Sequence, residues 1–92
     1  MKARIDCEDA YEAQKLASLI YVNSKETNII SILNMVGNEL VIALRDRSAH
    51  SILLRDRLHA EAFADFMQSV IDGEHRITRT VTLDSTVEIQ KA

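Results

Sequence analysis

Two runs of β-forming residues, 29–36 and 39–44, are separated by the pair Gly37-Asn38. A glycine and an asparagine tolerate the positive backbone φ angles of a two-residue turn, so the two runs are predicted to form a β-hairpin. This hairpin limits the fold more than any other local signal, because it requires antiparallel strands in the middle of the chain.

A two-residue turn also predicts which hairpin residues share a face, since side chains alternate along a strand. One face would be strongly apolar and carry the core: Ser31, Leu33, Met35, Leu40, Ile42 and Leu44. The opposite, outer face would include Ile30, Ile32, Val41 and Ala43, which is more apolar than a solvated face needs. We therefore expect something to cover the outer face.

A strand and a helix are predicted before the hairpin. Residues 2–7 alternate between apolar and polar, which is typical of a half-buried strand. Asp9 and Glu12 have the spacing of an N-terminal capping pair, and apolar residues then recur at helical intervals to about Tyr21. The polar stretch 23–28 is predicted to be a loop.

A second, longer helix is predicted after the hairpin. Ser48 or Ser51 could cap it, and it would run to Asp72 with Gly73 at its end. Its apolar residues fill more than half of the circumference, and one sheet cannot cover so wide an arc. We therefore predict a partner interface on this helix, formed by Ile52, Leu53, Ala60, Phe63, Met67 and Ile71.

The tail 77–89 alternates again and is predicted to be one long strand, or a hairpin that pairs Leu83 with Val87 around the loop 84–86. The predicted order is β-α-β-β-α-β, an α+β fold whose mostly antiparallel sheet has two helices on one face. The 92 residues form one domain, with a core from 2 to 72 and a strand-like tail, and no internal repeat is evident.

The composition excludes several classes of protein. Hydrophobic residues make up 47% of the chain and charged residues 27%, which is too apolar for a disordered chain. No apolar run approaches the roughly 20 residues of a spanning helix, and the N-terminus lacks a signal peptide. Cys7 is the sole cysteine, which rules out an internal disulfide, and it is predicted to be a small buried hydrophobe. We expect a cytoplasmic protein.

No catalytic equipment is visible. The chain has no phosphate-binding glycine loop or nucleophile elbow, and His50, His59 and His75 lack close ligand spacing. We therefore predict a protein that is not an enzyme and needs no metal or cofactor.

One basic cluster has the composition of a binding site, because arginine side chains suit phosphates and carboxylates. It comprises Arg45, Arg47, Arg55 and Arg57, a possible contact for RNA or an acidic partner. The alternative is a solvated surface with local ion pairs to Asp46 and Asp56. The net charge of −3 and the absence of aromatic residues from the predicted strands disfavour RNA binding.

Three segments resemble a known family, the small dimerising subunit of the KEOPS (EKC) complex, which also includes the CTAG antigens. They are Ala3-Arg4-Ile5-Asp6 followed by Glu8-Asp9, the hairpin segment Gly37-Asn38-Glu39-Leu40-Val41-Ile42, and Ser51-Ile52-Leu53-Leu54-Arg55-Asp56-Arg57-Leu58. The resemblance covers about residues 2 to 71. The family's proline-containing turn after the first helix is replaced by Tyr21-Val22-Asn23-Ser24, and the tail from Ile77 exceeds the family's typical end.

The resemblance implies a non-catalytic subunit that forms a homodimer, or a heterodimer with a paralogue. It would pack against the catalytic subunit that makes threonylcarbamoyladenosine in tRNA, and its contact with tRNA would be indirect. Two alternatives remain: a stand-alone ferredoxin-like or KH-like RNA-binding module, and a small ligand-sensing regulatory domain.

Overall fold

A computed structural model describes residues 1–25 and 30–92, which form two helices and six strands. In chain order these are β1 (Lys2–Asp6), α1 (Ala10–Lys25), β2 (Ile30–Val36), β3 (Glu39–Leu44), β4 (Ala49–Leu53), α2 (Arg57–Ile71), β5 (Ile77–Leu83) and β6 (Thr86–Lys91). The predicted α+β class is confirmed.

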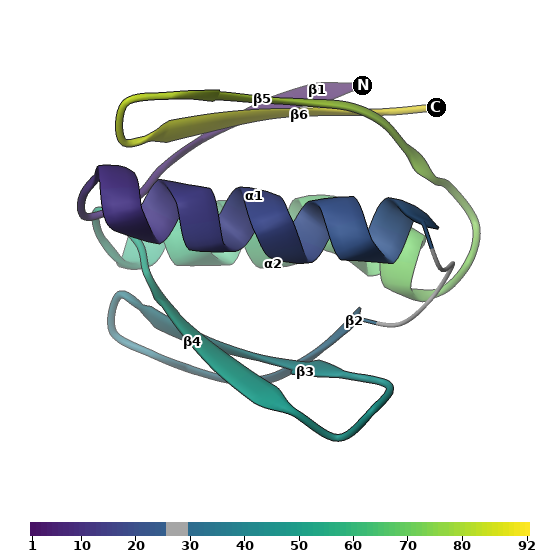
Figure 1. Ribbon diagram of the computed structural model, residues 1–92, viewed down its shortest axis with the longest axis horizontal. Coiled ribbons are helices and arrows are strands. Elements are labelled where there is room, and N and C mark those ends of the chain that lie inside the picture. Colours follow the sequence, from purple (N-terminus) through teal and green to yellow (C-terminus); the bar gives the residue numbers. More distant parts are fainter. Residues whose placement is uncertain (26–29) are drawn as a thin grey trace.

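The strands form two antiparallel sheets, and the two helices lie between them (Figure 1). One sheet has the strand order β1-β6-β5 and the other β2-β3-β4. Each sheet therefore packs one face onto the helices and turns its other face outward. The predicted antiparallel pairing is present, but the strands are divided between two sheets instead of one.

The chain contains an internal repeat that is not evident in the sequence. Adding 47 to the residue numbers of β1, β2 and β3 gives the bounds of β4, β5 and β6. Equivalent hydrogen bonds recur: the N–H of Cys7 donates to the carbonyl of Ser85 (2.7 Å), and that of Leu54 to the carbonyl of Asn38 (2.9 Å). Residues 2–44 and 49–91 are thus two βαββ halves.

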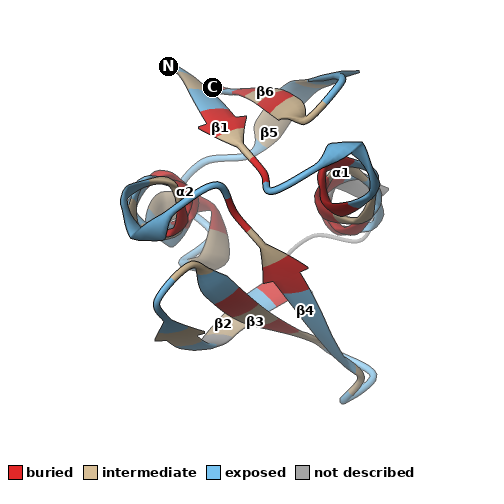
Figure 2. Cartoon of the chain, turned by 90° about the vertical axis from the view of Figure 1, so that its left-hand side faces the viewer, coloured by how far each residue is buried: buried red, intermediate tan, exposed pale blue. Residues whose placement is uncertain are grey.

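The two halves exchange strands. The first strand of each half pairs with the hairpin of the other half: β1 pairs with β6, and β4 pairs with β3. Each sheet therefore contains parts of both halves. The chain segments that follow β1 and β4 meet between the helices, where Cys7 forms an antiparallel bridge with Leu54 (Figure 2). Neither half therefore has a complete core of its own.

The predicted start of the second helix is wrong. Residues 49–53 form β4, which pairs with β3 along its whole length from Ala43–Ala49 to Glu39–Leu53. Helix α2 begins after Asp56, whose Oδ1 accepts a hydrogen bond from the N–H of His59 (3.0 Å). The helix ends as predicted near Asp72, followed by Gly73 with a φ of 80°.

The predicted strand and helix at the start of the chain are confirmed. Asp9 caps α1, because its Oδ1 accepts a hydrogen bond from the N–H of Glu12 (2.9 Å). The helix continues to Lys25, beyond the expected end at Tyr21. The predicted loop 23–28 is therefore helical to Lys25, and its residues 26–28 lie outside the described part of the chain.

The central hairpin is confirmed, with Gly37 at a φ of 60°, but its register changes at a bulge between Ile32 and Asn34. Beyond the bulge Ile32 pairs with Ile42 and Ile30 with Leu44, so Ile30 and Ile32 face the core. Ile30 is buried and Ile32 packs against the core cluster. Their assignment to the outer face is therefore wrong, because one extra residue exchanges the two faces of a strand.

The tail forms the hairpin β5-β6, closed by the two-residue turn Asp84-Ser85. Leu83 pairs with Thr86, not with Val87 as expected for a three-residue loop. Val87 consequently faces the core and is fully buried, whereas Leu83 faces outward and is 71% exposed.

Candidate binding surfaces

The predicted partner interface on the second helix is part of the core. Ala60, Phe63 and Met67 have no exposed surface, and Ile71 packs against the core cluster. The wide apolar arc is covered by the second sheet, because α2 lies between the two sheets (Figure 2). The remaining two residues, Ile52 and Leu53, belong to β4, with Ile52 fully buried. The arc therefore needs no partner.

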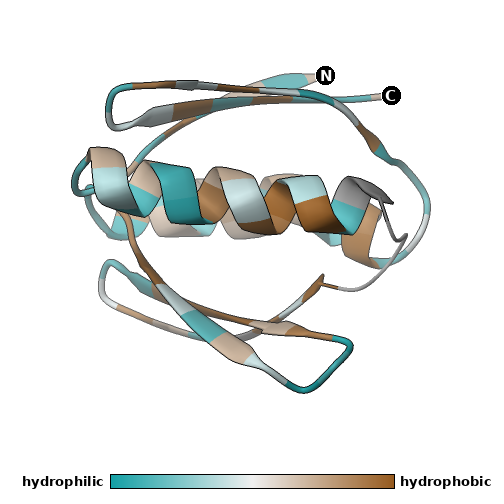
Figure 3. Ribbon diagram, in the orientation of Figure 1, coloured by the Kyte–Doolittle hydropathy of each residue, from teal (hydrophilic) through white to brown (hydrophobic). Residues whose placement is uncertain are grey.

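The four arginines do not form one cluster. Arg45 and Arg47 lie in the hydrophilic turn between β3 and β4, whereas Arg55 and Arg57 follow the other end of β4 (Figure 3). A five-residue strand is roughly 17 Å long. Arg55 pairs with Asp6, and Arg57 pairs with Glu61 at 2.8 Å. The basic binding site predicted from the sequence is thus divided between two ends of the sheet.

The turn between β3 and β4 is organised by Asp46. Its Oδ1 accepts hydrogen bonds from the N–H (2.9 Å) and the Oγ (2.6 Å) of Ser48, and these bonds lower the pKa of Asp46. The Ser48 Oγ also contacts the Nε2 of His50 at 3.0 Å. The bond to Asp46 orients the hydroxyl proton of Ser48 toward a carboxylate. His50 therefore does not receive this proton, as the general base beside a serine nucleophile must.

A polar cluster lies where the chain leaves β1, centred on the carboxylate of Asp6. This carboxylate accepts hydrogen bonds from Thr86 Oγ1 (2.8 Å), Arg55 Nη1 (3.2 Å) and Arg4 Nε (3.4 Å). The Nε2 of His59 lies 3.7 Å from Asp6 Oδ2. The hydrogen bond from Thr86 is the main cause that lowers the pKa of Asp6. Arg55, His59 and Arg4 also lower it, and partial burial acts in the opposite direction. The carboxylate is therefore ionised at neutral pH and already has partners.

The imidazole of His59 binds the unpaired backbone edge of β1 at Asp6. Its Nδ1 accepts a hydrogen bond from the N–H of Asp6 (3.0 Å), which places the ring proton of the neutral form on Nε2. In the other half Glu12 does the same, because its Oε2 accepts a hydrogen bond from the N–H of Leu53 (3.1 Å). This cluster joins the two halves and satisfies strand edges, which is a structural task. The sequence does not predict it, because Asp6 and Thr86 are 80 residues apart.

Cys7 is buried, as predicted. Burial, with smaller contributions from Glu12, Asp6 and Asp9, raises the pKa of its thiol to about 11. The thiolate needed for nucleophilic or redox chemistry is therefore scarce at neutral pH. Within residues 1–25 and 30–92, no group of three or more His, Cys, Asp or Glu side chains could hold a metal ion.

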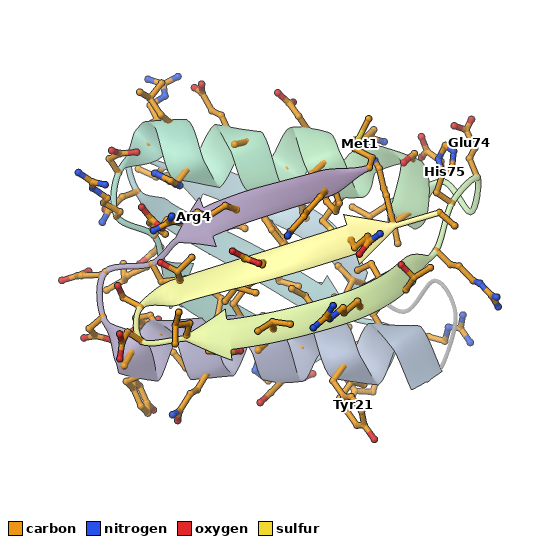
Figure 4. The ribbon with its side chains drawn as sticks, turned by 90° about the horizontal axis from the view of Figure 1, so that it is seen from above. Met1, Arg4, Tyr21, Glu74 and His75 are labelled. Atoms are coloured by element: carbon orange, nitrogen blue, oxygen red, sulfur yellow. The ribbon has the colours of Figure 1, made fainter. Side chains whose placement is uncertain are left out.

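The outer faces of the two sheets differ in charge. The charged face belongs to β1-β6-β5 and is seen from above in Figure 4: Lys2, Arg4, Asp6, Arg79, Val81, Leu83, Thr86, Glu88 and Gln90. The low-charge face belongs to β2-β3-β4: Ser31, Asn34, Val36, Glu39, Val41, Ala43, Ala49, Ser51 and Leu53. Glu39 alone among these residues of the low-charge face is ionisable. Val41 and Ala43 are the two predicted outer-face residues that lie there.

Two grooves flank α1. A groove of about 370 Å³ lies between α1 and β5 and is lined by Ala17, Ser18, Tyr21, Val22, Thr80 and Thr82. A second groove of about 330 Å³ lies between α1 and β4 and is lined by Tyr11, Gln14, Lys15, Ser18, Leu19, His50 and Ile52. In the second groove, Lys15 is held by Glu12 (2.8 Å) and by the carbonyl of Ser51 (3.0 Å).

No family model, curated protein or solved structure matches this chain. No helix in the described residues is long and apolar enough to cross a membrane.

Proposed function

We propose that this protein is a non-catalytic subunit that binds other macromolecules and forms a homodimer through the low-charge face. The observation that carries the proposal is the charge of that face, where Glu39 is the one ionisable residue among the described side chains. The equivalent face of the other sheet carries Lys2, Arg4, Asp6, Arg79 and Glu88.

The cost of removing charge from water favours the low-charge face as the contact. Burying an ionised side chain without a partner is strongly unfavourable, whereas small neutral side chains lose little hydration. Val36 is 65% exposed, and Val41 and Leu53 are partly exposed, so apolar area is available. Ala43 and Ala49 lie side by side and permit close approach of a second sheet.

The size of the face limits the strength of the contact. Three strands of about five residues span roughly 14 by 17 Å. This is about 240 Å² on each protomer, well below the roughly 800 Å² per partner of a standard interface, so the strand face alone supports only weak association. We therefore expect a weak monomer–dimer equilibrium, with the dimer populated only at high protein concentration, instead of a permanent dimer.

The finer proposal is a subunit of the KEOPS complex, acting in the cytoplasm in the threonylcarbamoyladenosine modification of tRNA. It is supported by the sequence resemblance alone, through segments such as Gly37-Asn38-Glu39-Leu40-Val41-Ile42. Copurification of the tagged protein with the enzyme that makes this modification would support it. Loss of the modified nucleoside when the protein is deleted would strengthen it, and normal levels would contradict it.

A matched pair of substitutions tests the dimer. Ala43 and Gln90 are equivalent positions in the central strands of the two sheets, and both face outward. We expect Ala43→Glu to shift the equilibrium to monomer, because two new carboxylates would be buried at the contact. Gln90→Glu adds the same charge beside Lys2 and Arg79 and should leave the equilibrium unchanged.

Sedimentation at increasing protein concentration measures both variants against the wild type. A wild-type protein that stays monomeric to several hundred micromolar would contradict the proposed dimer. A dimer that Gln90→Glu disrupts and Ala43→Glu leaves intact would move the contact to the other sheet. Salt-sensitive binding of RNA by the purified chain would instead favour the RNA-binding alternative.

A further inference from the structure

The four outer strands differ in how their free edges are satisfied. In β4 the N–H of Leu53 donates to Glu12, its carbonyl accepts from the N–H of Glu8 (3.0 Å), and the carbonyl of Ser51 accepts from Lys15. In β1 the N–H of Asp6 donates to His59, and its carbonyl accepts from the N–H of Arg55 (2.9 Å). These contacts prevent another strand from adding at the C-terminal ends of β1 and β4.

The edge of β5 is open. The two-residue turn makes Leu83 and Thr86 the closing hydrogen-bonded pair, so the alternate residues Thr82 and Thr80 direct N–H and C=O away from β6. Within the described part of the chain, no hydrogen bond reaches these outward groups. Two donors and two acceptors are therefore available in the spacing of a strand.

A groove with a small-residue floor lies beside these groups. Helix α1 runs along the β5 side of the sheet, and Tyr21 projects from it at the margin of the molecule (Figure 4). Ala17 and Ser18 leave the groove of about 370 Å³ between this helix and β5. Tyr21 is 60% and Val22 39% exposed, so apolar surface borders the groove at its far end. An added strand would thus lie over a helix and not in open solvent.

The equivalent edge in the other half has different side chains. There Met35 replaces Thr82, and it packs against the core cluster. On the helix, Asp65 and Gln68 replace Ser18 and Tyr21. The bulges also lie at non-equivalent positions, between Ile32 and Asn34 in β2 and between Ile77 and Arg79 in β5. The side-chain lining found beside β5 is therefore not repeated at β2.

The positive charge of Arg79 favours an acidic side chain on a strand that adds at this edge. It is exposed on the outer face of β5, and it forms no ion pair with any described residue. Glu88, the nearest acidic residue on the adjoining strand, is paired with Lys2 at 3.4 Å. A strand added at β5 would place one of its own side chains directly opposite Arg79, where an acidic residue is favoured.

We propose that the β5 edge binds an extended peptide segment of a partner protein, which adds to the sheet as a fourth strand. The segment has apolar or β-branched residues at alternate positions, facing Ala17 and Ser18, and an acidic residue opposite Arg79. Backbone hydrogen bonds to Thr80 and Thr82 supply affinity, and the groove and Arg79 select the sequence. The site is separate from the low-charge face, so the two proposals can fail independently.

The probe is a synthetic peptide, blocked at both ends, that alternates threonine and valine and has one glutamate at the position opposite Arg79. It is titrated into the isotope-labelled full chain while the backbone amide signals are recorded. We expect the amides of Thr80 and Thr82 to shift and to become protected from hydrogen exchange. No change at these amides with millimolar peptide overturns the proposal.

Three variants locate the peptide. Thr80→Pro removes an outward N–H without touching the pairing to β6, and should weaken binding roughly fivefold or more. Thr80→Val keeps that N–H and changes the side chain alone, so the proline variant should bind more weakly than the valine variant. Ser18→Tyr fills the groove from the helix side and should also weaken binding, which keeps the test decisive if the proline variant fails to fold.

A charge exchange tests the role of Arg79. Arg79→Glu should weaken binding of the glutamate peptide by roughly twofold to fivefold and strengthen binding of a lysine counterpart. Equal affinity of Arg79→Glu for both peptides overturns the assigned orientation. If the Thr80 and Thr82 amides become protected on raising the protein concentration without peptide, the guest strand comes from a second copy, and the partner-peptide proposal is overturned.

Discussion

The two halves of the chain share a backbone and differ in their surfaces. Residues 2–44 and 49–91 form the same elements at the same spacing, and identical residues such as Ile5 and Ile52, or Ala13 and Ala60, occupy the core. Outside the core the halves have diverged, since Val41 on one outer face corresponds to Glu88 on the other. The shared core maintains the fold, and the divergent surfaces are where binding specificity can reside.

The largest effects are expected at equivalent core positions. Phe63 and Leu16 correspond in the two helices, and both are fully buried. Phe63→Ala should lower the free energy of unfolding by about 3 to 5 kcal/mol and Leu16→Ala by about 2 to 5 kcal/mol, through lost burial and the cavity left behind. Urea unfolding measures both, and each variant should unfold in one transition because the halves share a core.

The matched control is Leu58→Ala, at an exposed position of α2, which should change stability by less than about 0.5 kcal/mol. Two separate unfolding transitions in either core variant would show that the halves are independent units.

Smaller losses are expected at the acceptors that close the strand edges. His59→Ala leaves the N–H of Asp6 without its acceptor, and Glu12→Ala does the same to the N–H of Leu53. Each should cost about 1 to 3 kcal/mol, because a partly buried donor loses its partner. Faster hydrogen exchange confined to the affected amide is the specific readout. Equal exchange in variant and wild type would show that the side-chain acceptor does not protect this amide.

One of these strand ends should contribute to stability in a pH-dependent way. Asp6 is ionisable, whereas the equivalent residue in the other half, Leu53, is not. The pKa of Asp6 is lowered in the folded protein from 3.8, chiefly by the hydrogen bond from Thr86. The unfolded chain therefore takes up the proton first as the pH falls. The stability advantage of the wild type over Asp6→Asn should be constant above about pH 5 and shrink below pH 4.

Unfolding of the two proteins at a series of pH values measures this advantage. An advantage that stays constant down to pH 2 would exclude Asp6 as the titrating group.

The smallest effects are expected in the two hairpin turns. Gly37 and Asp84 are equivalent and have φ angles of 60° and 52°. Gly37→Ala should cost about 1 kcal/mol from backbone conformation alone, because nothing lies within 4 Å of an added Cβ. Asp84→Gly relieves the same strain and should change stability by only about 0.5 kcal/mol. Equal losses from both substitutions would mean that the Asp84 side chain, not its φ angle, determines the effect.

Local signals in the sequence predicted several elements correctly. Asp9 caps the first helix, Gly37-Asn38 closes the first hairpin, and the alternation in residues 2–6 marks β1. Each depends on residues a few positions apart. The long-range features were missed: the Asp6 cluster joins residues from three separate segments, and the groove at β5 joins α1 to a strand more than 50 residues later.

The sequence by itself determined the α+β class, the antiparallel hairpins, and the caps and turns, because these depend on local hydrogen bonding and allowed backbone angles. Tertiary structure decided the rest. Residues 51–53 have an apolar spacing compatible with a helix, but hydrogen bonds to β3 make them a strand. A bulge in β2 turned Ile30 and Ile32 inward, and a second sheet covered the apolar arc of α2. In each case the deciding contact comes from a distant part of the chain, which local periodicity does not encode.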